Sequence, residues 1–142
     1  MAFSHGKVAV VKIGDATNTL VDISPITNTC DIPRSVATGE TTHFGDTAKE
    51  FIAGLEDGTV SIAGLFDSVL DATISAMVDS VANGTNANIK LEYGPQGSTT
   101  GKIKYSLNFV PTNYTITTPV GGVSTFKLDG QRTGVTVRTT YP

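Results

Sequence analysis

Alternation between apolar and polar positions is clearest between residues 103 and 109. Ile103, Tyr105, Leu107 and Phe109 alternate with Lys, Ser and Asn residues. Because successive side chains of a strand point to opposite faces of a sheet, this period of two predicts a strand with one buried and one solvated face. Shorter or weaker β-rich runs occupy residues 7–13, 20–23, 30–36, 59–66, 89–93, 114–118, 123–128 and 135–138.

One segment has the period of a helix instead. Ser68 and Asp71 have the spacing of a capping box, and Asn83-Gly84 is a typical left-handed helix stop. Between them the apolar residues fall on one stripe, at spacings of i, i+4, i+7, i+8 and i+11: Leu70, Ile74, Met77, Val78 and Val81. We therefore predict a helix over about residues 69–82, with its stripe against the sheet.

Turn-forming residues separate the β-rich runs. Residues 14–18 predict an opening hairpin, and Gly-containing turns follow at residues 94–97 and 121–122. Pro33 lies inside the 30–36 run, which makes that run an edge strand or a bulge. The pattern as a whole predicts a mainly β fold of about seven or eight strands, a β-sandwich or barrel-like domain with one flanking α-helix. We expect a single domain over residues 1–142.

The segment from residue 37 to residue 55 follows neither period. It is rich in Gly and Thr, yet it also contains Phe44, Phe51 and Ile52. A loop this long is uncommon inside a compact domain and usually has a function. Either it docks on a partner through these three residues, or it folds back over its own core. Both interpretations stay open at this point.

Composition narrows the classes of function. The chain has 142 residues, of which 39% are hydrophobic and 16% charged, below the roughly 25% charged residues of an average soluble protein. The net charge is −3 and the Lys and Arg residues are dispersed, which argues against a surface that grips nucleic acid. The apolar run at residues 8–11 is too short for a signal peptide or a membrane span, so we expect a soluble protein.

Candidate chemistry is sparse. His5 and His43 stand outside recognisable motifs, and a single Cys30 cannot complete a metal site or an internal disulfide. We expect Cys30 to be a small buried residue. The Gly-rich residues 94–102 lack the spacing and the following helix of a phosphate loop. We therefore predict no enzyme activity, no catalytic residues, no metal and no cofactor.

Several short phrases are spaced along the sequence. They are Asp-Ile-Pro-Arg-Ser at 31–35, Phe-Gly-Asp-Thr-Ala-Lys at 44–49, Ile-Ala-Gly-Leu at 52–55, Thr-Val-Ser-Ile-Ala-Gly-Leu-Phe-Asp at 59–67, Pro-Val-Gly-Gly-Val at 119–123 and Gly-Val-Thr-Val-Arg at 134–138. In these phrases the sequence resembles the major tail tube proteins of long-tailed (siphovirus-type) bacteriophages. The resemblance extends from about Val8 to Tyr141.

This resemblance implies a virion structural protein, made in the host cytoplasm, that self-assembles into stacked hexameric rings around a DNA channel. It implies that the loop at 37–55 is an assembly loop reaching the next ring, with Phe44, Phe51 and Ile52 as its contacts. Expected partners are further copies of the chain and other tail proteins such as the tape measure and the terminator, with no membrane. DNA would pass through without specific binding, and the mild acidity of the chain suits such a conduit because it repels phosphate.

Two alternatives remain. We expect no additional C-terminal domain of the kind that some tail tube proteins carry, and this departure leaves open a capsid decoration, head-tail connector or tail terminator subunit. A more distant alternative is a carbohydrate-binding β-sandwich module. Such modules display aromatic platforms, whereas this chain has no Trp and four Tyr, of which Tyr93 and Tyr105 fall within alternating strands.

Overall fold

A computed structural model describes residues 3–142, so Met1 and Ala2 of the predicted domain lie outside the described residues. The predicted mainly β fold with one α-helix is confirmed, with nine strands in the part that the structure describes. They are β1 (Val10–Gly14), β2 (Leu20–Asp22), β3 (Thr27–Asp31), β4 (Ser35–Glu40), β5 (Phe51–Asp57), β6 (Thr59–Leu65), β7 (Ile89–Gly94), β8 (Ile103–Thr117) and β9 (Thr125–Thr140). The helix α1 is Ser68–Ala82, and a short 3-10 turn, η1, is Gly6–Val8.

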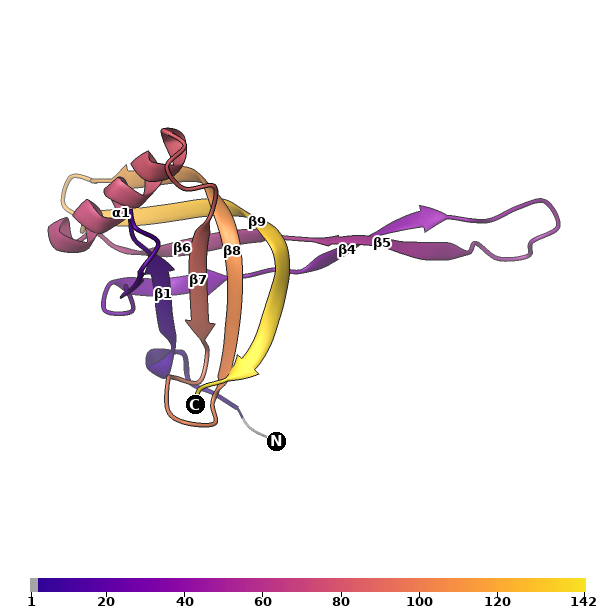
Figure 1. Ribbon diagram of the computed structural model, residues 1–142, viewed down its shortest axis with the longest axis horizontal. Helices are drawn as coiled ribbons and strands as arrows, with labels where there is room; N and C mark the ends of the chain where they lie inside the picture. The colour runs from indigo at the N-terminus through magenta and orange to yellow at the C-terminus, as the bar shows by residue number, and fades with distance from the viewer. Residues whose placement is uncertain (1–2) are drawn as a thin grey trace.

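Seven of the strands form one antiparallel sheet, in the order β2-β1-β7-β8-β9-β6-β3. The remaining two, β4 and β5, pair with each other as a separate hairpin that extends far from the rest of the molecule (Figure 1). The predicted opening hairpin is confirmed by the antiparallel pairing of β1 with β2. Within residues 3–142, no helix is long and apolar enough to cross a membrane.

The two longest strands, β8 and β9, belong to two layers of the fold. Near one end of the pair, residues 105–109 of β8 pair with β7, and near the other end, residues 125–131 of β9 pair with β6. Figure 1 shows both strands curving strongly between these regions. The first layer consists of β2, β1, β7, residues 103–109 of β8 and residues 133–140 of β9. The second layer is the remainder of the sheet.

Two register shifts accompany the bend of β8 and β9. One lies between Ser106 and Asn108, where β9 contains extra residues including Gly134, whose φ is +77°. The other lies between Pro111 and Asn113. Such bulges bend a strand and increase its twist, which lets one strand pair turn from one layer into the other. The sequence pattern predicts separate strands at 103–109 and 114–118, and again at 123–128 and 135–138. This prediction was wrong, because each pair of runs belongs to one continuous strand, with Pro111 and Gly134 at its bulge.

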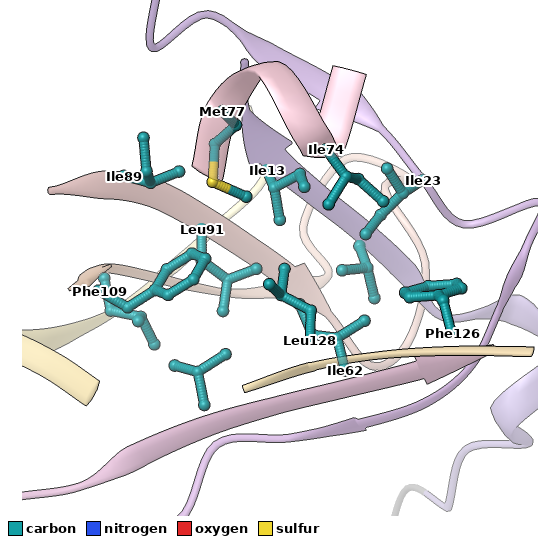
Figure 2. Packing of buried hydrophobic residues seen from close by; sticks show 13 residues of the cluster. Ile13, Ile23, Ile62, Ile74, Met77, Ile89, Leu91, Phe109, Phe126 and Leu128 are labelled. Atoms are coloured by element: carbon teal, nitrogen blue, oxygen red, sulfur yellow. The ribbon is translucent and has the colours of Figure 1, made fainter. Parts of the chain in front are cut away.

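The core lies between the two layers and beneath α1 (Figure 2). Ile74 and Met77 reach into it from the helix, which confirms the predicted stripe, while Phe109 and Leu128 come from the long strands. Gly130 lies against the Phe109 ring, because a Cβ at Gly130 would be 2.4 Å from the ring atom Cδ2. The buried apolar residues are Val11, Ile13, Ile23, Val60, Ile62, Ile74, Met77, Ile89, Leu91, Leu107, Phe109, Phe126 and Leu128.

The start of α1 differs from the predicted capping box. The N-cap residue is Asp67, whose side chain accepts a hydrogen bond from the Leu70 amide at 3.1 Å, so the prediction of Ser68 as the cap was wrong. Asp71, the expected second half of the box, instead accepts a hydrogen bond from the Tyr114 hydroxyl at 2.7 Å. A tertiary contact between helix and sheet thus replaces a local one, and the Asp67 carboxylate stabilises the helix N-terminus.

Replacing Leu128 with Ala should lower the free energy of unfolding by about 2–5 kcal/mol, because it leaves a cavity beneath a side chain that is fully buried. Urea unfolding followed by circular dichroism measures the effect. The same substitution at Leu55, which is 86% exposed, is the control and should change stability by no more than about 0.5 kcal/mol. Equal losses at the two positions would contradict this assignment of the core.

Candidate assembly surface

The hairpin of β4 and β5, residues 35–57, is named the ribbon below. Figure 1 shows it projecting from one side of the sheet, with a connecting loop at its far end. The expectation of a long irregular loop over 37–55 was wrong, because strands occupy residues 35–40 and 51–57 and leave residues 41–50 as the tip. Cross-strand hydrogen bonds between two short strands stabilise the segment, and these are not visible as an apolar period in the sequence.

The ribbon is an extension of the β3–β6 pair. Asp31 lies opposite Ser61 in the second layer, and Ser35 lies opposite Asp57 in the ribbon, so the register is unchanged across the junction. At the junction the strands approach closely, since a Cβ at Gly58 would be 2.3 Å from the carbonyl oxygen of Pro33. The strand predicted over 30–36 is therefore two strands that Pro33, which has no N–H donor, separates.

Two arginines hold the base of the ribbon. Glu56 accepts hydrogen bonds from Arg34 Nε at 2.6 Å and from Arg132 Nη1 at 3.1 Å. Arg132 is only 5% exposed and also donates to the Thr136 hydroxyl at 2.8 Å. A buried guanidinium requires a charged or polar partner, so Glu56 ties the ribbon to the bend of β9.

A second contact joins the same two elements. The side-chain amide of Gln131 donates to Asp57 Oδ1 at 2.6 Å and to the Gly58 carbonyl at 2.7 Å. The Arg132 backbone amide donates to the Gly58 carbonyl at 3.1 Å. Together with the Glu56 bridge, these bonds fix the direction in which the ribbon leaves the sheet.

The ion pairs of Glu56 with Arg34 and Arg132 also shift pKa values. The hydrogen bond from Arg34 lowers the pKa of Glu56 below its usual value of 4.5, although partial burial opposes the shift, and Arg132 adds to the lowering. The same hydrogen bond raises the pKa of Arg34. Both groups are therefore charged at neutral pH and form an ion pair.

The three residues predicted to make contacts are all on the outside. Phe44 is fully exposed at the tip, while Phe51 and Ile52 are 56% and 61% exposed on β5. Because they are adjacent in a strand, Phe51 and Ile52 point to opposite faces of the ribbon, and the structure does not gather the three into one cluster. The ribbon does not fold back on the core, which was the second interpretation of this segment.

Sequence reasoning missed two further apolar side chains of the ribbon. Leu55 is 86% exposed on β5, and Val36 is 56% exposed on β4. Each has small neighbours, and Leu55 is also followed by Glu56. Only knowledge of the strand pairing could therefore have indicated that they lie on an isolated two-stranded element. Such an element is marginally stable in water on its own, and both of its edges are free of other strands within residues 3–142.

The tip has local structure but no catalytic arrangement. The Asp46 carboxylate accepts hydrogen bonds from the His43 backbone amide at 2.7 Å and lies 2.8 Å from His43 Nδ1. Elsewhere, burial raises the pKa of the Cys30 thiol to about 12, so a reactive thiolate is disfavoured. The described residues contain no group of three or more His, Cys, Asp and Glu side chains placed to hold a metal ion.

A second free edge lies on β9. Residues 133–140 pair with β8 on one side, and no strand of the described chain pairs with them on the other. Val135 and Val137 on this stretch are 68% and 47% exposed. A long, exposed and partly apolar edge is a template for pairing with another chain.

Solved structures with the same fold come from tails and injection systems. A chain from the tail of an empty gene transfer agent particle, refined with C6 symmetry, has a TM-score of 0.76 at 15% identity and covers 97% of this chain and 100% of that one. A chain of the SPP1 tail tube has a TM-score of 0.69 at 10% identity, covering 97% of this chain and 80% of that one. These likenesses show a shared fold.

A third neighbour comes from the sheath/tube terminator of PVC, an extracellular contractile injection system, in its extended state. It has a TM-score of 0.66 at 10% identity and covers 99% of both chains. No protein-family model and no curated protein matches the sequence.

Replacing Glu56 with Gln should make the protein less stable at pH 7 and remove part of its acid sensitivity. Because the folded-state pKa of Glu56 is lowered, its carboxylate contributes stability above the usual pKa of 4.5, and this contribution is lost as the pH falls through the folded-state pKa. Urea unfolding at a series of pH values should show the two proteins converging below that pH.

The control for this experiment is Glu40→Gln, which removes an exposed ribbon carboxylate that forms no ion pair among the described residues. Its stability should follow the wild-type curve from neutral to acid pH. A Glu56→Gln protein whose curve also stays parallel to that of the wild type would disprove a role for the bridge.

Proposed function

We propose that this chain is a non-enzymatic structural subunit that assembles with copies of itself into stacked hexameric rings, forming a phage-type tail tube. The observation that carries the proposal is the ribbon, an isolated two-stranded element that holds exposed apolar side chains outside the sheet. The fold it shares with a chain from a C6-symmetric tail supports the ring order of six. As a tail component, the protein belongs in the virion.

The ribbon has a physical reason to seek a partner. Free strand edges and exposed apolar side chains are unfavourable in water and are covered in stable assemblies. Covering the ribbon with another subunit would bury Phe44, Phe51 and Ile52, at about 25 cal/mol per Å² of apolar surface. We infer that the residues 37–55 contact a neighbouring subunit through these side chains.

Ring closure uses the first layer. Its outer edges within one subunit are β2 and the free edge of β9, so adjacent subunits joined edge to edge would form a continuous barrel. Closing a sheet into a barrel removes its free edges altogether. The exposed Val135 and Val137 would then lie at the joint between subunits.

The face of the first layer that points away from the core suits a channel wall. Lys12 lies opposite Asp22 on one side and Glu92 on the other, while Lys90 and Lys104 lie opposite neutral residues. Such a face has mixed charge, and the described residues form no extended basic stripe on it to bind phosphate. DNA would pass along it without specific binding, and the tape measure and other tail proteins would be further partners.

A terminator or connector role is the second candidate. It is supported by the neighbour from a sheath/tube terminator structure, which matches over nearly the whole chain. Negative-stain electron microscopy of the purified protein separates the two candidates. Hollow tubes of uniform width with six-fold rings would establish the tube role, closed rings that never stack would favour a terminator or connector, and a persistent monomer would contradict both.

The double substitution Phe44→Ser and Phe51→Ser should leave the subunit folded and stop tube growth. Neither side chain contributes to the buried core, so the free energy of unfolding should change by no more than about 1 kcal/mol. Tube length in micrographs and the thermal unfolding of the monomer are the two measurements.

Val69→Ser is the matched control, because this side chain is 73% exposed but belongs to α1. It removes exposed apolar surface without altering the ribbon and should permit normal tubes. Tubes of normal length from the ribbon double variant would remove the proposed role of Phe44 and Phe51.

A further inference from the structure

The negative charge of the chain is concentrated on the ribbon. Residues 35–57 contain five carboxylates and a single Lys, which gives a net charge of −4. The rest of the chain contains eight carboxylates and nine Lys or Arg residues, which gives a net charge of +1. The ribbon therefore differs from the rest of the protein in charge as well as in exposure.

Part of this charge is already paired within the subunit. Glu56 binds two arginines, Asp57 accepts a hydrogen bond from Gln131, and Asp46 contacts His43. Glu40 and Glu50 are exposed and form no ion pair among the described residues. Glu40 ends β4 and Glu50 directly precedes β5. The two lie close together where the tip begins, since the Thr41 amide donates to the Glu50 carbonyl at 2.8 Å.

The opposite sign gathers at the end of the sheet that holds the C-terminus and the loop between β7 and β8 (Figure 1). This basic end consists of Lys7, Lys102, Lys104 and Arg138. Backbone hydrogen bonds of 2.9 Å from Gly101 to the Tyr141 carbonyl and from Tyr141 to the Lys102 carbonyl join the β7–β8 loop to the C-terminal segment.

The four basic side chains lie around the C-terminal segment that contains Tyr141. Lys104 Nζ is 5.4 Å from the centre of the Tyr141 ring, and Arg138 lies on β9 opposite Tyr105 of β8. Lys7 belongs to η1, which is close to this loop because a Cβ at Gly97 would be 3.2 Å from the Val8 carbonyl oxygen. Glu92 and Asp22 are the acidic side chains close to Tyr141, so the four cations at this end outnumber the acids.

The ribbon cannot reach the basic end of its own subunit. It leaves the sheet from the bend of β9 and projects to the side, whereas the C-terminus and the β7–β8 loop lie at the bottom of the view (Figure 1). We infer that the tip half of the ribbon docks on the basic end of a second copy of the chain, with Glu40 and Glu50 facing Lys7 and Lys102. This inference rests on the proposed self-assembly and specifies its surfaces.

Such a contact is heterologous, because it joins two different surfaces of identical subunits. A heterologous contact whose rotation does not close continues from copy to copy, so it can stack rings in one direction. The apolar side chains of the ribbon would supply the buried area, and the charges would select the correct surface and speed the encounter.

Substitutions that reverse the charges on the ribbon and on the basic end test the inference. The pair Glu40→Lys and Glu50→Lys, or the pair Lys7→Glu and Lys102→Glu, should each lower the initial rate of tube growth at least about tenfold at low salt. A chain carrying all four substitutions should recover the wild-type rate to within about twofold. Light scattering measures the rate, micrographs identify the product, and added salt should slow the wild type.

Asp79→Lys is the matched control, since this exposed carboxylate lies on α1 and should be reversed without effect. If Asp79→Lys stops tube growth and the further substitutions Lys7→Glu and Lys102→Glu restore it, then α1 and not the ribbon contacts the basic end, and the inference is overturned. If the wild type forms tubes but the chain with all four substitutions does not recover growth, the inferred docking contact is overturned while the proposed function stands. A wild type that forms no tubes at any salt concentration would overturn both.

Discussion

The antiparallel pairing of β8 with β9 is the interaction on which the whole architecture depends. It runs from Ile103–Thr140 at one end to Thr117–Thr125 at the other, and each layer of the fold is built on a different part of it. The bulges allow this pair to bend, the bend brings Phe109 and Leu128 into one core, and Arg132 at the bend holds the ribbon. Core, layer arrangement and ribbon direction therefore share one origin.

Where side chains alternate or form a helical stripe, the sequence alone was sufficient. The 103–109 strand, the α1 stripe and the turn at 121–122 were correctly predicted because their periods report burial on one face. Prediction failed where backbone pairing decides the outcome. The bulge at Pro111 preserves β8 despite a residue that usually ends strands, and the ribbon has no buried face to produce a period.

The residues of the candidate assembly surface could likewise be predicted only in part. Phe44, Phe51 and Ile52 stood out in the sequence because large apolar residues are unusual in a polar segment. The anchor between Glu56 and Arg132 could not be predicted, because these residues are distant in the sequence and only the fold places them 3.1 Å apart. Similarly, the dispersed lysines and arginines gave no sign in the sequence that four of them lie at one end of the sheet.

The unchanged register across Pro33 and Gly58 has a mechanical consequence. A force applied to the ribbon tip acts along β4 and β5, which continue into β3 and β6 of the second layer. There β6 is hydrogen-bonded to β9. Such a force acts parallel to the strands, so the bonds between β6 and β9 must yield together by sliding instead of opening one after another. If the ribbon contacts a neighbouring subunit as proposed, this geometry would transmit tension between subunits through the sheet and leave the helix unloaded.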